Sequence, residues 1–181
     1  MNPERLRRVD DVLDALAAGA FADDGEDLNV LEHSLQCALL LRRSRERDVE
    51  LQVAGLVHDV GTVLDPEHPE THAETGAAAV AELLGARVAR LVARHADAKR
   101  FLVTTDPTYA RALSARSRET LAAQGGPMDH DELGAWRAMP GLRTVVSLRR
   151  ADDAAKVPGA DAGDLAGWRD AIEEIAATRV G

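Results

Sequence analysis

Leu56-Val57-His58-Asp59-Val60-Gly61 joins an apolar run to an adjacent histidine and aspartate. On a regular helix, neighbouring side chains point about 100° apart, so His58 and Asp59 can serve one centre only where a helix ends. An imidazole and a carboxylate among apolar residues are costly to bury unless both are paired or coordinated. The stretch therefore predicts a helix end that is held at a bound metal ion.

Helical periodicity extends from this stretch in both directions. Apolar residues recur at intervals of three and four, and no run alternates between apolar and polar residues as a strand would. Two helix starts have the signature of a capping box, Asn29 with Glu32 and Thr71 with Glu74. The fold class is therefore predicted to be all-α. Helices are expected over residues 4–18, from Asn29, over 49–60, from Thr71, around 88–95, and over 108–123, 129–139, 142–156 and 164–178.

Length and composition limit the classes of protein that this chain can represent. Its 181 residues suffice for one core, so we expect a single metal-binding domain over residues 1–181. A net charge of −9 argues against nucleic-acid binding, which needs clustered Lys and Arg. The sequence shows no apolar run of about 18 residues and no N-terminal signal segment, which favours a cytoplasmic protein without membrane association. The single cysteine, Cys37, excludes an internal disulfide, and the oligomeric state is left open.

Six residues with metal-binding side chains occupy inward or helix-end positions. Each alone has a simpler explanation, because a single histidine on an apolar helix is more often a hydrogen-bonded core residue than a ligand. Together, imidazoles and carboxylates suit iron, manganese or zinc, and six ligands are more than one catalytic zinc needs. A dinuclear centre bridged by Asp59 would use them all. The six are His33, His58, Asp59, His72, His95 and Asp152, with His68 as an alternative to His72.

The order of these residues resembles the HD-domain superfamily of metal-dependent proteins, most of which are phosphohydrolases. Longer segments resemble one branch, the mixed-valent diiron oxygenases, which includes myo-inositol oxygenase and the oxygenases that cleave the carbon–phosphorus bond of organophosphonates. The adjacent His-Asp pair alone is a weak signal, whereas His-x-x-x-Lys-Arg at 95–100 and Arg-Arg-x-Asp-Asp-x-x-Lys at 149–156 are specific together. The resemblance to the phosphonate group covers nearly the whole chain and implies an HD-domain helical bundle. Residues 25–26, 31–33, 72–77 and 124–128 also match.

The resemblance implies a cofactor of two iron ions, Fe(II) and Fe(III), with O2 as co-substrate. Asp59 would be shared by both ions and would be a catalytic residue. The implied substrate is a small anionic organic molecule, and the implied reaction is oxidative carbon–phosphorus cleavage of a 1-hydroxyphosphonate with release of phosphate. The implied ligands are His33, His58, Asp59 and Asp152 for one iron, and Asp59, His72 and His95 for the other.

Several further residues are candidates for contacts with that substrate. Lys99 follows His95 by one helical turn; its charge could offset a helix end, but we favour binding of the substrate's anionic group. Arg149 and Ser117 have the same assignment from their family positions, and we expect neither Lys99 nor Arg149 to be held in a structural ion pair. Glu26 is a candidate for a catalytic role and for contact with a cationic group of the substrate. The alternative interpretation is that Glu26 is simply a solvated residue of an acidic loop.

Two positions differ from the phosphonate oxygenases that the chain resembles. Asp23 stands where those enzymes have a tyrosine that guards the oxygen site, and Thr62 stands where they have a histidine that contacts the phosphonate. Thr62 is accordingly a candidate substrate contact. Asp23 could supply an extra ligand, although a solvated acidic loop is the simpler interpretation.

Three functional classes are consistent with these residues. The leading interpretation is the diiron oxygenase. The second is an HD phosphohydrolase, in which two metal ions activate water against a small phosphate ester or nucleotide. The third is a non-catalytic module that a metal ion stabilises. Activity without oxygen would favour the second class, and a closed metal site with no adjacent pocket would favour the third.

Overall fold

The computed structural model describes residues 5–24 and 27–179, and their regular secondary structure is helical apart from one isolated bridge between Asp23 and Asn29. The prediction of an all-α fold is confirmed. The α-helices are α1 (Val9–Ala18), α2 (Val30–Ser44), α3 (Val49–Val57), α4 (Val60–Leu64), α5 (His72–Thr105), α6 (Pro107–Ala112), α7 (Ala115–Ala123), α8 (His130–Ala138), α9 (Leu142–Ala154) and α10 (Arg169–Ala177). Short 3-10 helices lie at Gly19–Phe21, Pro69–Thr71 and Leu165–Trp168.

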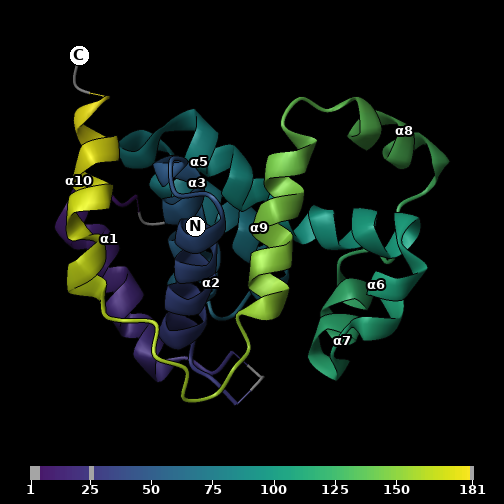
Figure 1. Ribbon diagram of the computed structural model, residues 1–181, viewed down its shortest axis with the longest axis horizontal. Helices are drawn as coiled ribbons and strands as arrows, with labels where there is room; N and C mark the ends of the chain where they lie inside the picture. Colours follow the sequence, from purple (N-terminus) through teal and green to yellow (C-terminus); the bar gives the residue numbers. More distant parts are fainter. Residues whose placement is uncertain (1–4, 25–26, 180–181) are drawn as a thin grey trace.

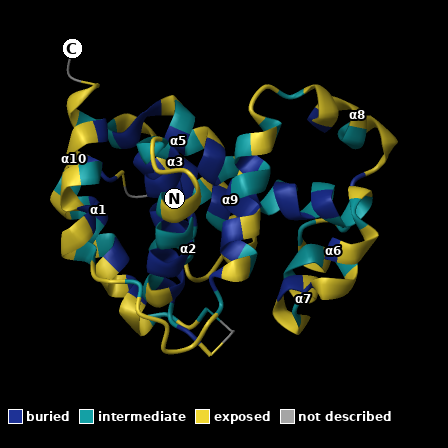
Figure 2. Ribbon diagram, in the orientation of Figure 1, coloured by how far each residue is buried: buried dark blue, intermediate teal, exposed yellow. Residues whose placement is uncertain are grey.

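The central helices form the core of the molecule. α2 packs on α3 and α9, and α5 packs on α3, α4 and α9. α1 and α10 cover one side, while α6, α7 and α8 form a group on the other side of α9 (Figure 1). Buried residues concentrate on the central helices (Figure 2), and α3 is the most enclosed, with Val53, Leu56 and Val57 fully buried. A helix that is apolar on most of its circumference is expected at such a position.

The predicted helix over 49–60 is divided at the His-Asp pair. α3 ends at Val57 and α4 begins at Val60, so His58 and Asp59 occupy the junction. Asp59 has φ −102° and ψ 9°, which departs from helical geometry. Because the chain turns at this point, two neighbouring side chains can face one centre, as the apolar run ending in a His-Asp pair predicted.

Close contact between α4 and the first turns of α5 depends on glycine. A Cβ atom at Gly61 would lie 2.0 Å from the carbonyl oxygen of His72, so a larger residue would displace the backbone. Gly76 faces the same contact, where a Cβ would lie 3.1 Å from the Gly61 nitrogen. This approach brings the α3–α4 junction up to His72 at the start of α5.

One other helix boundary differs from the sequence prediction, whereas the break inside α5 agrees with it. α5 (His72–Thr105) consists of two helical segments that meet at Gly85, whose φ of 83° and ψ of 172° are not helical, as expected from separate helices starting at Thr71 and around 88–95. The predicted helix over 108–123 is instead α6 and α7. The Ser114 hydroxyl accepts a hydrogen bond from the Ser117 amide, and this cap begins a new helix.

The two predicted capping boxes have different outcomes. The first is confirmed, because the Asn29 side chain accepts from the Glu32 amide while the Glu32 carboxylate accepts from the Asn29 amide. The second is wrong. α5 begins after Thr71 without a side-chain cap, and the Thr71 hydroxyl donates instead to the carbonyl of His68.

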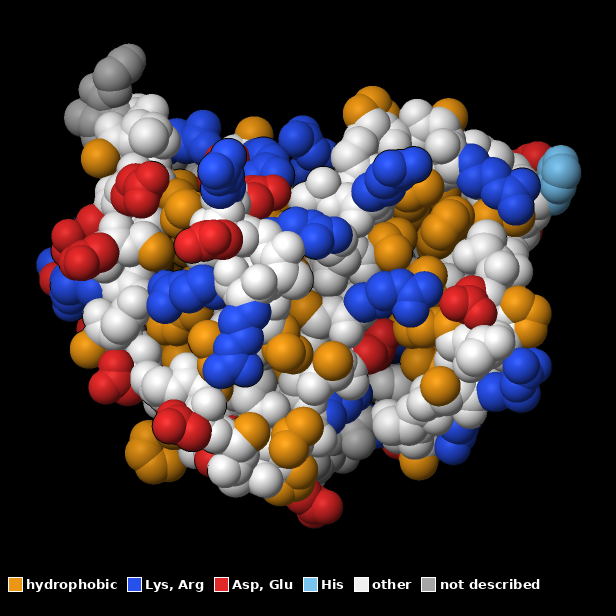
Figure 3. All heavy atoms as spheres, in the orientation of Figure 1, with side chains coloured by type: hydrophobic (Ala, Val, Ile, Leu, Met, Phe, Trp, Pro, Cys, Tyr) orange, Lys and Arg blue, Asp and Glu red, His pale blue; other side chains and the backbone are white. Residues whose placement is uncertain are grey.

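The charged side chains are unevenly distributed over the surface. On the face shown in Figure 3, Asp and Glu are most frequent on the left, over α1 and α10, whereas Lys and Arg lie mainly over the centre and the right. Cations are thus gathered on part of a chain whose net charge is −9. Within the described ranges, no helix has both the length and the apolarity that crossing a bilayer requires.

Candidate metal centre

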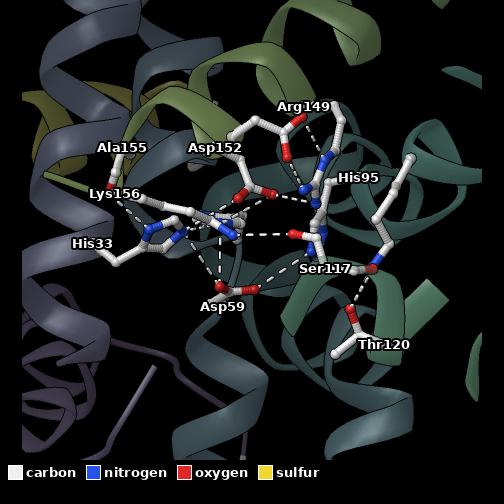
Figure 4. A network of polar contacts seen from close by, with 12 residues as sticks. His33, Asp59, His95, Ser117, Thr120, Arg149, Asp152, Ala155 and Lys156 are labelled. Carbon is white, nitrogen blue, oxygen red and sulfur yellow. Dashed lines mark hydrogen bonds and ion pairs between the residues drawn. The ribbon is translucent and has the colours of Figure 1, made fainter. Parts of the chain in front are cut away.

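Six side chains from separate parts of the fold converge inside the bundle, and Figure 4 shows four of them by name. They are the six residues singled out in the sequence, and their role as ligands stays a prediction. His68, the alternative to His72, is exposed and pairs with Glu70 instead. α2 supplies His33, the α3–α4 junction supplies His58 and Asp59, α5 supplies His72 and His95, and α9 supplies Asp152.

Asp59 divides the cluster into two donor sets. Its Oδ2 atom lies 3.2 Å from His58 Nε2 and 3.6 Å from His33 Nε2. Its Oδ1 atom lies 3.4 Å from His95 Nε2 and 3.5 Å from His72 Nε2. One carboxylate therefore faces two histidine pairs with different oxygens, which is the arrangement expected of a ligand that bridges two ions.

Asp152 adds a second carboxylate to the first of these sets. Its Oδ1 lies 3.4 Å from His33 Nε2, and its Oδ2 lies 3.8 Å from His58 Nε2. The first set thus contains two imidazoles and two carboxylates, whereas the second contains two imidazoles and the shared Asp59. The second set has fewer protein donors, so an ion held there would have more positions open for a substrate.

Each histidine of the cluster is oriented by a backbone carbonyl that accepts a hydrogen bond from its Nδ1. A carbonyl oxygen only accepts, so the proton is fixed on Nδ1, and Nε2 of the neutral ring directs a lone pair toward the centre. Two such lone pairs close together repel each other unless a cation lies near both, so the geometry fits bound metal ions. The Nδ1 acceptors are Ala155 for His33 (3.0 Å), Gly55 for His58 (2.8 Å), Pro69 for His72 (2.7 Å) and Val92 for His95 (2.7 Å). The Nε2 atoms are 3.2 Å apart in the His33–His58 pair and 3.1 Å apart in the His72–His95 pair.

The carboxylates make the centre attractive to cations. Burial alone lowers the pKa of His58, but the charges of Asp59 and Asp152 outweigh burial and raise that pKa to about 9. Burial raises the pKa of Asp59, yet the neighbouring histidines outweigh it and hold that pKa well below its ordinary range. Imidazole nitrogens and carboxylate oxygens without a thiolate suit iron. Cys37 is buried and belongs to none of the donor groups found among the described residues.

Arg149 lies behind Asp152 in a network of buried ion pairs. Its Nη1 donates to Asp152 Oδ2 at 2.6 Å, and its other guanidinium nitrogens donate to Asp153 and to the Tyr109 hydroxyl. The Tyr109 hydroxyl in turn donates to Asp153 Oδ2 at 2.7 Å. The expectation that Arg149 forms no structural ion pair is therefore wrong. Arg149 also lines the pocket described next, and its contact with substrate stays a prediction.

A pocket of about 280 Å³ opens beside the six residues. Lys99 lies in its wall, where Nζ donates to Thr120 Oγ1 at 2.6 Å. Burial, together with the charge of Arg149, lowers the pKa of Lys99 to about 8. Ser117 and Thr62, two further candidate substrate contacts, also line the pocket. An open pocket beside the centre argues against the third functional class, a closed metal site of purely structural use.

The acidic loop before α2 contributes Asp23, which the sequence had singled out, and Asp24, which it had not. Asp23 and Asp24 both line the pocket. Asp24 Oδ2 is buried 3.8 Å from His33 Nδ1, without a hydrogen-bond partner in the described ranges, and burial raises the pKa of this carboxyl. Asp24 has no distinguishing signal within an acidic turn-forming stretch. Glu26, the predicted catalytic and substrate-binding residue of this loop, lies outside the described residues.

Comparison with known proteins agrees with this geometry. Residues 30–124, just over half of the chain, match the HD domain family. A hydroxymethylphosphonate dioxygenase of Gimesia maris is 34% identical over 157 residues, which cover 82% of this chain and 78% of the relative. A 1-hydroxy-2-(trimethylamino)ethylphosphonate dioxygenase (glycine-betaine-forming) of Leisingera caerulea is 31% identical over 140 residues, which cover 73% and 71% respectively. The chain therefore belongs to the HD-domain family, on the branch that contains these phosphonate dioxygenases.

Proposed function

We propose that this protein is a diiron oxygenase that uses O2 to oxidise a small hydroxylated phosphonate, cleaving its carbon–phosphorus bond and releasing phosphate. The observation that carries the proposal is the position of Asp59, whose two carboxylate oxygens face separate histidine pairs. The phosphonate dioxygenases among the relatives support the reaction class. When bound, the two iron ions would supply electrons for the reaction with O2 and hold the hydroxyl group of the substrate.

The side chains around the centre have distinct tasks in this proposal. The backbone bonds to Nδ1 keep the histidines in one orientation, so the donor geometry is formed before substrate arrives. Lys99 and Ser117 bind the anionic group, because charge-assisted hydrogen bonds are strong in a partly buried site. The pocket volume of about 280 Å³ limits the substrate to a small molecule.

The pocket also holds carboxylates that bear on the choice of phosphonate. Asp23, Asp24 and Glu70 all line it. Asp24 Oδ2 is buried and has no hydrogen-bond partner among the described residues, and such an oxygen is suited to a cationic group. The Leisingera relative is named for a substrate with a trimethylamino group, whereas the Gimesia relative is named for one without it. Both compounds are therefore appropriate test substrates.

Phosphate release tests the proposed reaction class. The iron-loaded protein is given each of the two hydroxyphosphonates in air, and in parallel a phosphate monoester and a nucleotide, with products followed by phosphorus NMR. Phosphate from a phosphonate requires a broken carbon–phosphorus bond, whereas phosphate from an ester requires only hydrolysis. We expect release from at least one hydroxyphosphonate and none from the esters. The opposite pattern would assign the chain to the HD phosphohydrolases.

Substrate affinity should depend on the charge of Lys99. The pKa of this side chain is lowered to about 8, so its ammonium group is charged below that pH and becomes neutral above it. Phosphonate affinity should therefore fall as the pH rises through about 8. Lys99→Ala should weaken binding about tenfold to a hundredfold at pH 7 without loss of metal. Calorimetric titrations without oxygen, from pH 6.5 to 9.5, measure both effects.

Lys99→Arg serves as the control for this titration. A guanidinium group stays charged over the whole range, so the variant should lose the inflection near pH 8 even if its affinity is lower throughout. An inflection that persists in Lys99→Arg, or a Lys99→Ala variant that loses its iron, would show that Lys99 does not bind the anion.

A further inference from the structure

The guanidinium group of Arg149 is held between two carboxylates of its own helix. Its Nε and Nη2 atoms donate to the two oxygens of Asp153, and this side-on pair fixes the plane of the group. Its Nη1 atom donates to Oδ2 of Asp152 at 2.6 Å. Figure 4 shows Arg149 on one side of Asp152 and His33 on the other. One cation therefore serves two carboxylates, of which Asp152 alone belongs to the metal centre.

The two oxygens of Asp152 face different neighbours. Oδ2 accepts the hydrogen bond from Arg149, whereas Oδ1 lies 3.4 Å from His33 Nε2, on the side of the metal centre. A cation beside a ligating carboxylate weakens its bond to a metal ion, because both positive charges compete for the same negative charge. The strength of Asp152 as a ligand therefore depends on how far the charge of Arg149 is neutralised by another group.

Asp153 supplies this neutralisation. The side chains of Arg149 and Asp152 are each 6% exposed, and that of Asp153 is 23% exposed. Charges in so enclosed a setting are screened little by water. With Asp153 the group of three has a net negative charge, whereas without it the charges of Arg149 and Asp152 cancel. Asp153 belongs to none of the donor groups found among the described residues, so its contact with the centre runs through Arg149.

Tyr109 fixes Asp153 from a separate helix, α6. Its hydroxyl donates to Asp153 Oδ2 at 2.7 Å and accepts from Arg149 Nε at 3.2 Å. The Tyr109 ring is buried in a small apolar cluster with Leu102 and Leu113, separate from the main core. The Asp153 carboxylate is thus kept beside the guanidinium group, although part of its side chain reaches solvent.

We propose that Asp153 is a positioning residue that holds Arg149 and offsets its charge, which keeps Asp152 a strong ligand and lowers the reduction potential of the iron ion at the first donor set. The inference rests on the proposed function, from which the iron comes. Negative charge near an iron ion favours Fe(III) over Fe(II), because the oxidised ion has one more positive charge. Asp153 lies in the Arg-Arg-x-Asp-Asp-x-x-Lys segment, where the sequence assigned it no role.

The reduction potentials of the iron-loaded protein test this role without substrate or turnover. Anaerobic redox titrations of the parent and of Asp153→Asn are followed by the EPR signal of the mixed-valent form. The variant should raise the potential of at least one of the two one-electron couples by about 59 mV or more, a tenfold shift toward Fe(II) at a given potential. Asp153→Glu keeps the charge and should recover most of the shift. Potentials in Asp153→Asn equal to those of the parent would overturn the assignment.

Two control variants separate the charge of Asp153 from general damage to the site. Tyr109→Phe removes hydrogen bonds from the same network without changing its charge, so the potentials should stay near those of the parent. Glu74→Gln removes a carboxylate charge two residues from His72, where the side chain is exposed and water screens it. This variant should also keep the parent potentials. A shift in either control as large as that in Asp153→Asn would overturn the role of the Asp153 charge.

The outcomes separate this inference from the proposed function. If Asp153→Asn did not retain iron, Asp153→Glu would decide: iron retained at the parent potentials would support the inference, and iron lost again would overturn it. A parent protein without a mixed-valent EPR signal would overturn the diiron centre and the inference together. A parent that shows the expected shifts but no oxygen-dependent phosphate release would leave the inference supported and overturn only the oxygenase reaction.

Discussion

Asp59→Asn is expected to abolish turnover and to leave the protein with less than half of the iron that the parent binds. The carboxylate faces one histidine pair with Oδ2 and the other with Oδ1. An amide offers only one acceptor oxygen and places an NH2 group toward the second pair. The loss of activity should exceed the 10- to 100-fold typical of removing a residue that merely orients a ligand. Iron per chain and oxygen uptake are measured after identical anaerobic loading.

Glu82→Gln is the control for this variant. Glu82 is a half-exposed carboxylate on α5, paired with Arg5 and Arg7 and absent from the pocket wall. The same change of carboxylate to amide should there alter neither iron content nor activity. If Asp59→Asn kept the iron content and oxygen uptake of the parent, Asp59 could not be the bridge between two ions.

Arg149→Met should lower the free energy of unfolding by about 3–5 kcal/mol, the usual cost of removing one partner from a buried ion pair. Arg149 is 5% exposed and donates to both Asp152 and Asp153. Its removal leaves two carboxylates and the Tyr109 hydroxyl without their cation. Urea unfolding of the iron-free protein measures the effect, because bound metal would add its own stabilisation.

Arg150→Met tests whether this effect is specific to the buried network. The neighbouring arginine is exposed, and its Nη2 lies 3.3 Å from a carboxylate oxygen of the partly exposed Asp106. Because this ion pair is open to solvent, the replacement should change the unfolding free energy little. If Arg149→Met unfolded like the parent and lost only substrate affinity, the buried ion pairs would be of minor importance. The substrate role expected from the sequence would then be the correct one.

The fold class and the location of the centre could be predicted from the sequence because both depend on local rules. Helical periodicity and the absence of alternating runs predict an all-α chain. The adjacent His58 and Asp59 predict a helix end, since neighbouring helical side chains diverge. The structure has that end between Val57 and Val60. The boundary at Ser114 was missed, because a cap within an apparent helix gives little periodic signal.

The partners of the pocket residues were harder to predict, for two different reasons. Arg149 has Asp152 and Asp153 three and four residues ahead on one helix, which is the spacing of helical ion pairs. The sequence therefore contained a signal for these ion pairs, but Arg149 was assigned to substrate binding because of its position in the family that the chain resembles. Lys156 and Gln36 have no such signal. Their contacts join the segment that follows α9 to α7 and to α2 across long stretches of sequence, and only the packing of the bundle brings these segments together.

Oxygen dependence of phosphate release is the most direct test of the central claim. A single iron-loaded preparation, reduced partway to Fe(II)/Fe(III), is given the hydroxyphosphonate that it accepts, and phosphate and dissolved oxygen are followed together. We predict that phosphate release stops when oxygen is removed, resumes when oxygen is readmitted, and proceeds with oxygen consumed in proportion to phosphate formed. Phosphate release at an undiminished rate under strict anaerobiosis would contradict the account and would make this chain a hydrolase.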